Sequence, residues 1–404
     1  MNKARAKPPK PTDMEATRDF SLVQGGPLFQ MLRRSRLTDD AMELLHRRIV
    51  AFALMAWLPL LVLSAVDGHL LGDSVAIPFL RDWEVHVKFL VALPLLVATE
   101  LTAHRRLRFT VQQFQERNLV PDNARTRFEA AVASAYRLRN SKLAEVILMA
   151  LVYGVGVLVV WRQYVALDVL TWYGTPSDQG RTLTLAGTWY GYVSLPIFQF
   201  LLIRWYFRLL IWMRFLWQVS RIKLQLMPTH PDATGGLGFL SRSAEAFVLL
   251  ATAHGALLAG QLANRIFYSG ATLTDFKLEC GLLVAFLLIM LLGPLFVFTP
   301  QLEKTWRDGG REYGSLAHRY VREFDTKWLR GGAPPGEELI GSGDIQSLAD
   351  IGASFERVQG MRLWPFGRTA VMMVVVATLV PLTPLLLTMM PLAELAKKLF
   401  GILF

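Results

Sequence analysis

The chain has 404 residues, of which 53% are hydrophobic and 19% are charged, and its formal net charge at pH 7 is +11. That charged fraction lies below the quarter typical of soluble domains, so the composition argues against a soluble globular protein. A single cysteine, Cys280, excludes an intramolecular disulfide and a thiolate metal cluster. The basic residues flank apolar runs, which predicts contact with the anionic headgroups of a lipid bilayer and no binding of nucleic acid.

Seven apolar runs are close to the length that a helix needs to cross a membrane, which is roughly 20 residues for a hydrocarbon core about 30 Å thick. They predict an all-α fold, a polytopic membrane helix bundle of about seven transmembrane helices with cytoplasmic helical extensions. The predicted spans are Ile49–Val66, Val87–Ala103, Leu143–Trp161, Trp189–Met213, Ala244–Phe267, Cys280–Thr299 and Ala370–Met390.

Lys and Arg are distributed unevenly among the segments that connect these runs. Four segments carry ten, nine, six and ten of them, namely residues 1–48, 104–142, 204–243 and 300–369. The three segments in between carry one, two and one, namely residues 67–86, 162–188 and 268–278. Because positive charge is retained on the cytoplasmic side, this alternation predicts a cytoplasmic N-terminus and, with seven spans, an outside C-terminus.

Residues 1–48 form a basic cytoplasmic N-terminal segment. The first two dozen residues have few large apolar side chains and are predicted to be disordered. The stretch Pro27–Leu37 mixes apolar side chains with arginines and is predicted to lie on the inner leaflet. Asp40, with Glu43 three residues later, is expected to cap the helix that enters the first span. No cleavable signal peptide is expected, because the first long apolar run begins only after residue 48 and continues as a span.

Residues 49–299 are predicted to form a six-span membrane bundle with cytoplasmic helical loops. The composition of residues 118–123 indicates a turn. No helix breaker follows Ala124, so the third span is expected to extend into the cytoplasm as one unbroken helix.

Residues 300–369 are predicted to form a cytoplasmic helical hairpin docked under the bundle. Its first helix is expected to be interrupted at Gly309 and Gly310. Its second helix is expected to begin near Asp344, a plausible N-cap residue, and to end at Gly360.

Residues 370–404 are predicted to contain the seventh span and an amphipathic tail on the outer leaflet. Pro381 and Pro384 together free two backbone carbonyls near the middle of this span. They predict a hinge, where a broken helix would line a cavity or a pore.

The most distinctive short segment is His230–Phe239, between the fourth and fifth predicted spans. Its Gly235, Gly236 and Gly238 backbone could bind an anion at the N-terminus of the next helix, with His230 and Asp232 as polar partners. The segment lacks the Lys-Ser/Thr of a P-loop and follows no predicted strand. A tight turn whose glycines permit close helix packing is the favoured interpretation.

The fifth predicted span carries polar residues at membrane depth. His254 and Gln261 lie seven residues apart on one helical face, and Asn264 and Arg265 follow them. Such residues face the bundle interior and are functional candidates. An interhelical hydrogen bond made by a neutral His254 is an equally weighted alternative.

The fourth predicted span ends with Arg204, Arg208 and Arg214 among tryptophans. This pattern indicates an aromatic belt with snorkelling arginines. Glu100 and Glu145, at the inner ends of the neighbouring spans, are predicted to pair with these arginines in a structural role.

Two segments, residues 230–240 and 343–356 with its continuation to Phe366, resemble those of an uncharacterised family of bacterial multi-pass membrane proteins. The resemblance implies a bacterial inner membrane and no particular activity. Both segments are predicted to be cytoplasmic. One hypothesis is that they form a single site faced by His230, Asp232, Asp344 and Gln346.

The sequence contains no recognisable catalytic motif, metal-binding motif or cofactor fingerprint, so it predicts no cofactor and gives no positive indication of an enzyme. Its polar fifth span and its proline pair favour a channel or transporter for ions or small solutes. The large basic cytoplasmic segments suggest, as an alternative, a signalling or assembly component with a protein partner or a second copy of the chain at the cytoplasmic face. A lipid-modifying membrane enzyme is the third alternative.

Overall fold

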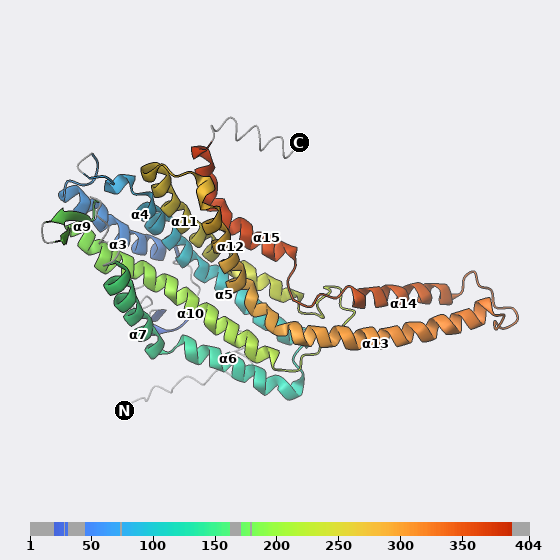
Figure 1. The fold of residues 1–404 in the computed structure, drawn as a ribbon. Coiled ribbons are helices and arrows are strands. Elements are labelled where there is room, and N and C mark those ends of the chain that lie inside the picture. Colours follow the sequence, from blue (N-terminus) through green and yellow to red (C-terminus); the bar gives the residue numbers. More distant parts are fainter. Residues whose placement is uncertain are drawn as a thin grey trace, which may run out of the picture.

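The computed structural model describes residues 20–27, 29–30, 45–72, 75–161, 171–177 and 180–389. Six continuous helices in this part of the chain are long and apolar enough to cross a membrane: Leu45–Val66, Trp83–Glu116, Leu185–Ser220, Gly238–Ser269, Leu273–Leu329 and Arg368–Thr388. A seventh span is made if the bent pair Asp122–Arg139 and Lys142–Val157 crosses as one unit. The structure therefore confirms the predicted all-α bundle of a multi-pass membrane protein, whose helices lie side by side in Figure 1.

Most of these long helices combine an α-helical part with tighter or wider turns. The first is α3 alone, Leu45–Val66. Two of the others contain a π turn: α4 (Trp83–Val87), the turn Lys88–Ala92 and α5 (Leu93–Glu116) form one, and α9 (Leu185–Trp189), the turn Tyr190–Ser194 and α10 (Leu195–Ser220) form the next. Two contain one 3₁₀ segment each: Gly238–Phe247 precedes α11 (Val248–Ser269), and Val380–Thr388 follows α15 (Arg368–Leu379). The longest consists of a 3₁₀ turn (Leu273–Phe276), α12 (Lys277–Leu292), a 3₁₀ turn (Gly293–Phe298), α13 (Thr299–Phe324) and a π turn (Asp325–Leu329).

Four of the irregular turns coincide with prolines, among them the 3₁₀ turn Gly293–Phe298, which contains Pro294. The π turns Lys88–Ala92 and Tyr190–Ser194 end two residues before Pro94 and Pro196. A proline lacks the backbone N–H and its ring clashes with the carbonyl four residues earlier, and a local change of pitch relieves both problems. In the last span the 3₁₀ segment Val380–Thr388 runs through Pro381 and Pro384, so the helix changes pitch there and continues.

The third predicted span is not one unbroken helix. It consists of α6 (Arg125–Arg139), α7 (Lys142–Leu151) and a π-helical stretch (Val152–Trp161), with a bend of 48° between α6 and the following helix. The break has a local cause, because the Ser141 hydroxyl accepts from the Ala144 N–H and starts a new helix. The predicted continuous extension is therefore wrong, and the N-cap residue Ser141 is the reason.

A small antiparallel hairpin follows the third span. Its strands β1 (Gly174–Ser177) and β2 (Gly180–Leu183) pair Gly174 with Leu183. Beside it the ring of Trp172 is fully buried and packs edge-on against Phe79 at 5.0 Å. These contacts join two of the segments that are poor in basic residues.

The loops gather at two ends of the bundle, as the alternating charge distribution requires. At one end, the Gln225 N–H donates to the carbonyl of Leu119, and Arg362 donates to the carbonyl of Asp232. All of these residues belong to segments rich in Lys and Arg, and we call this end the basic end. At the opposite end, the Asn264 amide donates to Asp82.

The N-terminal segment is packed at the basic end from Phe20 onward. Phe20 is fully buried and stacks against Tyr136 of α6, with Trp212 and Phe215 of α10 at centroid distances of 6.3 and 5.3 Å. The prediction of disorder is therefore wrong for residues 20–24, because Phe20, Leu22 and Val23 supply enough apolar surface to hold the segment. Residues 1–19, most of the predicted interfacial stretch and the predicted cap at Asp40 lie outside the described residues.

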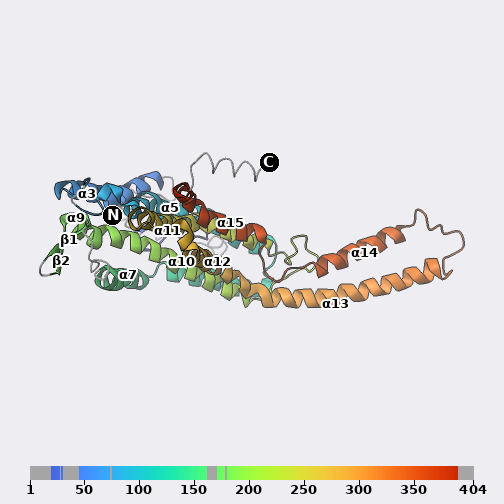
Figure 2. The same ribbon diagram turned by 45° about the horizontal axis from the view of Figure 1, so that its top comes forward.

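Helices α13 and α14 (Gly343–Gln359) form the predicted hairpin, but it is not docked under the bundle. Figures 1 and 2 show both helices running outward from the basic end. The helix Leu273–Leu329 has 57 residues, which corresponds to about 85 Å of helix and far exceeds a bilayer core. Only the base of the hairpin is buried, at Leu302, Gly309 and Val358.

Gly309 was predicted to interrupt this helix, but α13 continues through it. The glycine instead allows a close contact with a neighbouring loop. A Cβ at this position would lie 2.5 Å from the Cβ of Pro228, so only glycine lets the loop cross the helix here. Gly309 therefore contributes to packing through its missing side chain and is not a helix breaker.

Candidate functional site: a buried arginine cluster

Arg204 and Arg208 lie one turn apart on α10 and face the interior of the bundle. Both side chains are at most 7% exposed. Between them, Trp205 donates its indole N–H to the carbonyl of Leu96 on α5 at 2.9 Å, and the Arg208 guanidinium lies 4.7 Å from the Trp205 ring centre. This hydrogen bond fixes the rotation of α10 against α5 and so aims both arginines at the same helix.

Glu100 of α5 receives these arginines. Its Oε1 accepts from Arg208 Nη1 at 2.9 Å and lies 3.7 Å from Arg204 Nη1. Its other oxygen accepts from Arg48, in the first turns of α3. The Glu100 side chain is 4% exposed, so one buried carboxylate joins three helices of the bundle.

A second carboxylate lies at the edge of this group. Glu145, in the first turn of α7, is 3.6 Å from Arg204 Nη2 and is 15% exposed. The predicted pairing of Glu100 and Glu145 with the arginines of the fourth span is thus present in the geometry. The predicted snorkelling is not, since Arg204 and Arg208 point inward, whereas Arg214 is exposed.

We call Arg48, Glu100, Glu145, Arg204 and Arg208 the arginine cluster. Its three cations face two carboxylates, which leaves a formal charge of +1 in a buried position. In addition, Nε and Nη1 of Arg48 and Nη2 of Arg208 are buried and have no hydrogen-bond partner among the described residues. A buried charge without full pairing is costly, and these N–H groups have the chemistry to hold a small anion.

The N-terminal segment closes the cluster at the basic end. A Cβ at Gly26 would lie 3.1 Å from Glu145 Oε1 and 3.7 Å from Arg204 Nη2, so the Gly26 backbone rests directly on the cluster. Its φ is +84°, a conformation that favours glycine. The Gly26 N–H donates to the Asn140 side chain at 3.1 Å, which anchors this contact to the end of α6.

Two hydrogen bonds of Ser21 hold the same segment against α5 and α6. The Ser21 carbonyl accepts from Arg139 Nη1 at 2.6 Å, and its hydroxyl lies 2.9 Å from His104 Nδ1 on α5. Residues 20–26 therefore close the space between α5, α6 and α10 beneath the cluster. This segment was not predicted from the sequence, although the apolar residues Phe20, Leu22 and Val23 shortly before the pair Gly25-Gly26 were a usable signal.

His254 makes an interhelical hydrogen bond, which was one of the two interpretations predicted for it. Its Nε2 accepts from the hydroxyl of Tyr206 on α10 at 2.6 Å, and its Nδ1 lies 2.7 Å from the carbonyl of Leu250. The ring is 6% exposed. Both nitrogens have partners, and His254 does not belong to the arginine cluster.

The other polar residues of α11 lie towards the end opposite the basic one. Asn264 accepts from the Trp83 N–H at 3.0 Å and donates to Asp82, which also accepts from the indole of Trp172 at 2.8 Å. This arrangement caps the helix that begins at Trp83. Gln261 is half-buried, and the Arg265 guanidinium lies 5.7 Å from the ring centre of Phe276.

The loop around His230 is a tight turn closed by Asp232. The carboxylate of Asp232 accepts from the N–H groups of Thr234, Gly236 and Gly238 at 2.8, 3.1 and 2.8 Å. Burial raises the pKa of Asp232, but these three donors and the neighbouring His230 outweigh burial and hold that pKa below its usual value. The backbone donors that could have bound an external anion are thus already occupied.

The glycines of this loop have backbone and packing roles. Gly235 and Gly236 have φ values of +64° and +99°, and a Cβ at Gly238 would lie 2.9 Å from the Asp232 carboxylate. They permit the close turn that the sequence analysis favoured.

Asp344 and Gln346 are not near this loop. They lie in the first turn of α14, at the outer end of the hairpin, where Asp344 pairs with Lys327 at 2.8 Å and accepts from the Trp328 indole. The N-cap of α14 is Ser342, not Asp344. The loop instead meets Arg362, whose backbone N–H and Nη2 donate to the carbonyls of Ala233 and Asp232. The structure thus joins the two motif segments at Arg362 and does not form the predicted shared site.

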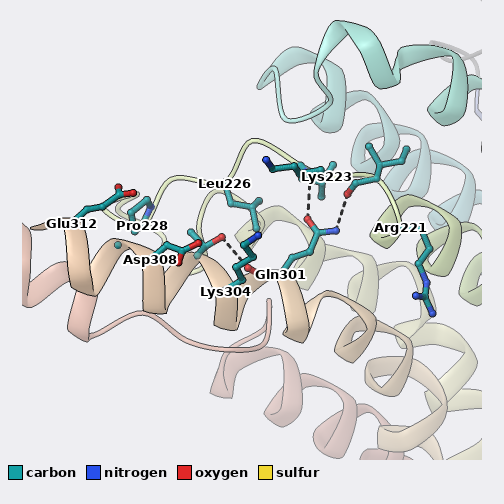
Figure 3. Close-up of a pocket in the computed structure, with 12 residues that line it drawn as sticks. Arg221, Lys223, Leu226, Pro228, Gln301, Lys304, Asp308 and Glu312 are labelled. Carbon is teal, nitrogen blue, oxygen red and sulfur yellow. Dashed lines mark hydrogen bonds between the residues drawn. The ribbon is translucent and has the colours of Figure 1, made fainter.

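A pocket lies where the hairpin leaves the bundle. Figure 3 shows this pocket of about 420 Å³, between residues 221–228 and α13. Gln301 fixes its inner wall, because its amide donates to the Ile222 carbonyl at 2.8 Å and accepts from the Leu224 N–H at 3.2 Å. Three basic side chains line it, Arg221, Lys223 and Lys304, and two acidic ones, Asp308 and Glu312, so the acidic side chains offset most of its positive charge.

The part of the chain that the structure describes holds no group of three or more His, Cys, Asp or Glu side chains placed to bind a metal ion. Comparisons of the chain with protein families, with curated proteins and with solved structures find no match.

Proposed function

We propose that this membrane protein transports small inorganic anions and that the arginine cluster is its binding site. The observation that carries the proposal is the buried surplus of positive charge, together with the unpartnered N–H groups of Arg48 and Arg208. An anion held between those two guanidiniums would neutralise the cluster and complete its hydrogen bonds.

The position of the cluster suits a transport site. Its five side chains come from four helices, α3, α5, α7 and α10, so rearrangement of these helices would alter access to it. The N-terminal segment closes it on the basic side. Towards the other end of the bundle, aromatic side chains pack against one another, among them Phe89 and Phe198 with ring centroids 6.4 Å apart. The described conformation is then an occluded one.

We also propose that the basic end, the N-terminal segment and the hairpin lie in the cytoplasm, because Lys and Arg are concentrated in the segments at this end. A bacterial inner membrane is the setting that the sequence resemblance suggests.

Anion binding can be tested without a transport assay. A ligand that binds only the folded protein raises its thermal midpoint by mass action, so chloride, nitrate or phosphate is added to purified protein at constant ionic strength. We expect at least one anion to raise the midpoint of the wild type and of Arg214→Gln, an exposed arginine on the same helix. In Arg208→Gln, whose cluster has no net charge, the rise should be lost. Equal rises in all three proteins would contradict the proposal.

A role in assembly is the second candidate, favoured by the outward hairpin. Its tip exposes large apolar side chains, with Ile340 88% and Leu329 71% exposed. Such side chains on a projecting element suit a protein partner or a second copy of the chain. Crosslinking from Ile340 in cells would detect either. Recovery of the uncrosslinked chain alone, with an efficient crosslinker, would count against this role.

A further inference from the structure

A separate groove opens on the side of the bundle at the basic end. It has a volume of about 740 Å³ and lies where the 3₁₀ turn Gly293–Phe298, the linker after α14 and the first turns of α15 meet. Since α12 and α15 belong to candidate membrane spans, the groove lies where these spans leave the membrane. It is lined by Phe296, Arg362, Trp364, Phe366, Gly367, Arg368, Val371 and Met372.

Three aromatic rings form the wall of the groove. Phe296 packs edge-on against Phe366 at 5.3 Å, and Trp364 lies 6.4 Å from Phe296. Trp364 and Phe296 are nevertheless 43% and 49% exposed, and the neighbouring Met372 is 57% exposed. Aromatic side chains in this position are typical of the membrane interface, and the open apolar wall suits an acyl chain.

The charged side chains of the groove are all positive. Arg368 is exposed at the first position of α15, and among the described residues it has no ion-pair partner. The first turn of α15 contains no acidic residue, and none lines the groove. Arg362 is held in place by the carbonyl of Asp232. Positive charge beside an apolar wall is complementary to a negatively charged headgroup with its acyl chain.

We infer that this groove binds one phospholipid with an anionic headgroup, the phosphate against Arg368 and an acyl chain along Phe296, Trp364 and Met372. A soluble phosphorylated metabolite would leave the aromatic wall exposed, and a zwitterionic lipid would leave Arg368 without a net negative partner. The inference does not depend on the transport proposal, because the groove shares no side chain with the arginine cluster.

The first test is native mass spectrometry of the purified protein, titrated with phosphatidylglycerol or phosphatidylcholine of identical acyl chains. A basic side chain near an anionic lipid surface favours binding by about fivefold. We therefore expect the first lipid to bind about fivefold more tightly when it is phosphatidylglycerol. Arg368→Gln should reduce this preference to about onefold, and Arg368→Lys should keep most of it. Arg214→Gln serves as the matched control and should keep the wild-type preference.

A second measurement places the acyl chain. Brominated phospholipids quench tryptophan fluorescence on contact, and we expect brominated phosphatidylglycerol to quench the wild type more than Trp364→Phe. An unchanged preference in Arg368→Gln, or the same loss in Arg214→Gln, would overturn the inference. So would equal quenching in Trp364→Phe and the wild type. Preference for glycerol phosphate without acyl chains would show a soluble phosphate ligand instead.

Discussion

Arg208 on α10 donates to Glu100 on α5 over 2.9 Å, and each of these side chains is only 4% exposed. The same carboxylate also binds Arg48 and faces Arg204. One acidic side chain thus contacts three cations from two other helices, so we expect the stability of the fold to depend on it more than on any single arginine.

Glu100→Gln should be strongly destabilising. The substitution leaves three buried arginines against Glu145 alone, and removal of one partner from a buried ion pair costs about 3–5 kcal/mol. We expect a large fall in the thermal midpoint of the detergent-solubilised protein. Glu323→Gln, which changes an exposed carboxylate of α13, should leave the midpoint within error. Arg208→Gln should lower the thermal midpoint less than Glu100→Gln does. A larger decrease for Arg208→Gln would contradict this view of the cluster.

Gly26→Val should release the N-terminal segment from the cluster. The positive φ and the short approach to Glu145 exclude a larger side chain at Gly26. Accessibility can be read from a cysteine at Val23, which is 1% exposed, after Cys280→Ala removes the native thiol. We expect Val23→Cys to resist a polar maleimide in the otherwise native chain and to react at least about tenfold faster with Gly26→Val. Equal rates would show that the segment does not depend on Gly26.

Tyr206→Phe should have a small effect. It removes the hydroxyl that donates to His254, and interhelical hydrogen bonds of this kind contribute on average about 0.6 kcal/mol. We expect a slightly lower thermal midpoint and unchanged anion binding. A loss of anion binding comparable with that of Arg208→Gln would place His254 in the functional site after all.

Asp232 should make stability sensitive to acid. Its pKa is lower in the folded protein than in the unfolded chain, so the fold favours the ionised form. The stabilisation by ionised Asp232 is complete at pH values above the pKa of the unfolded chain, which is about 4. It is lost as the pH falls through the lower pKa of the folded protein. Asp232→Asn should lower stability by about 1–3 kcal/mol at pH 7. The difference from the wild type, measured by thermal unfolding between pH 7 and pH 3, should shrink in acid, whereas a constant difference would contradict this role.

The sequence predicted the helical bundle well, because the length and the apolar character of a span are properties of a single segment. The same reasoning failed where a residue acts through a distant partner. Arg204 and Arg208 resemble interfacial arginines along the chain, and only the packing of α10 on α5 shows that they point at Glu100. Arg48 was counted as a flanking charge for the same reason.

The structural roles of the glycines were the hardest to predict from the sequence. Gly309 was expected to break a helix, yet it lies within α13 and makes room for Pro228. By contrast, Gly235 and Gly236 have the positive φ values that a tight turn requires. Whether a glycine supplies conformational freedom or missing volume depends on its three-dimensional neighbours, which no local pattern records.

The most direct test of the proposed function is anion flux from proteoliposomes that contain wild-type protein, Arg208→Gln or Arg214→Gln at equal density. The proposal predicts efflux of at least one small inorganic anion above that of protein-free vesicles for the wild type and Arg214→Gln. For Arg208→Gln it predicts a decrease of at least about tenfold, since the anion would lose a buried charged partner. Vesicles that stay sealed to chloride, nitrate and phosphate, with Gly26→Val as well as the wild type, would contradict it.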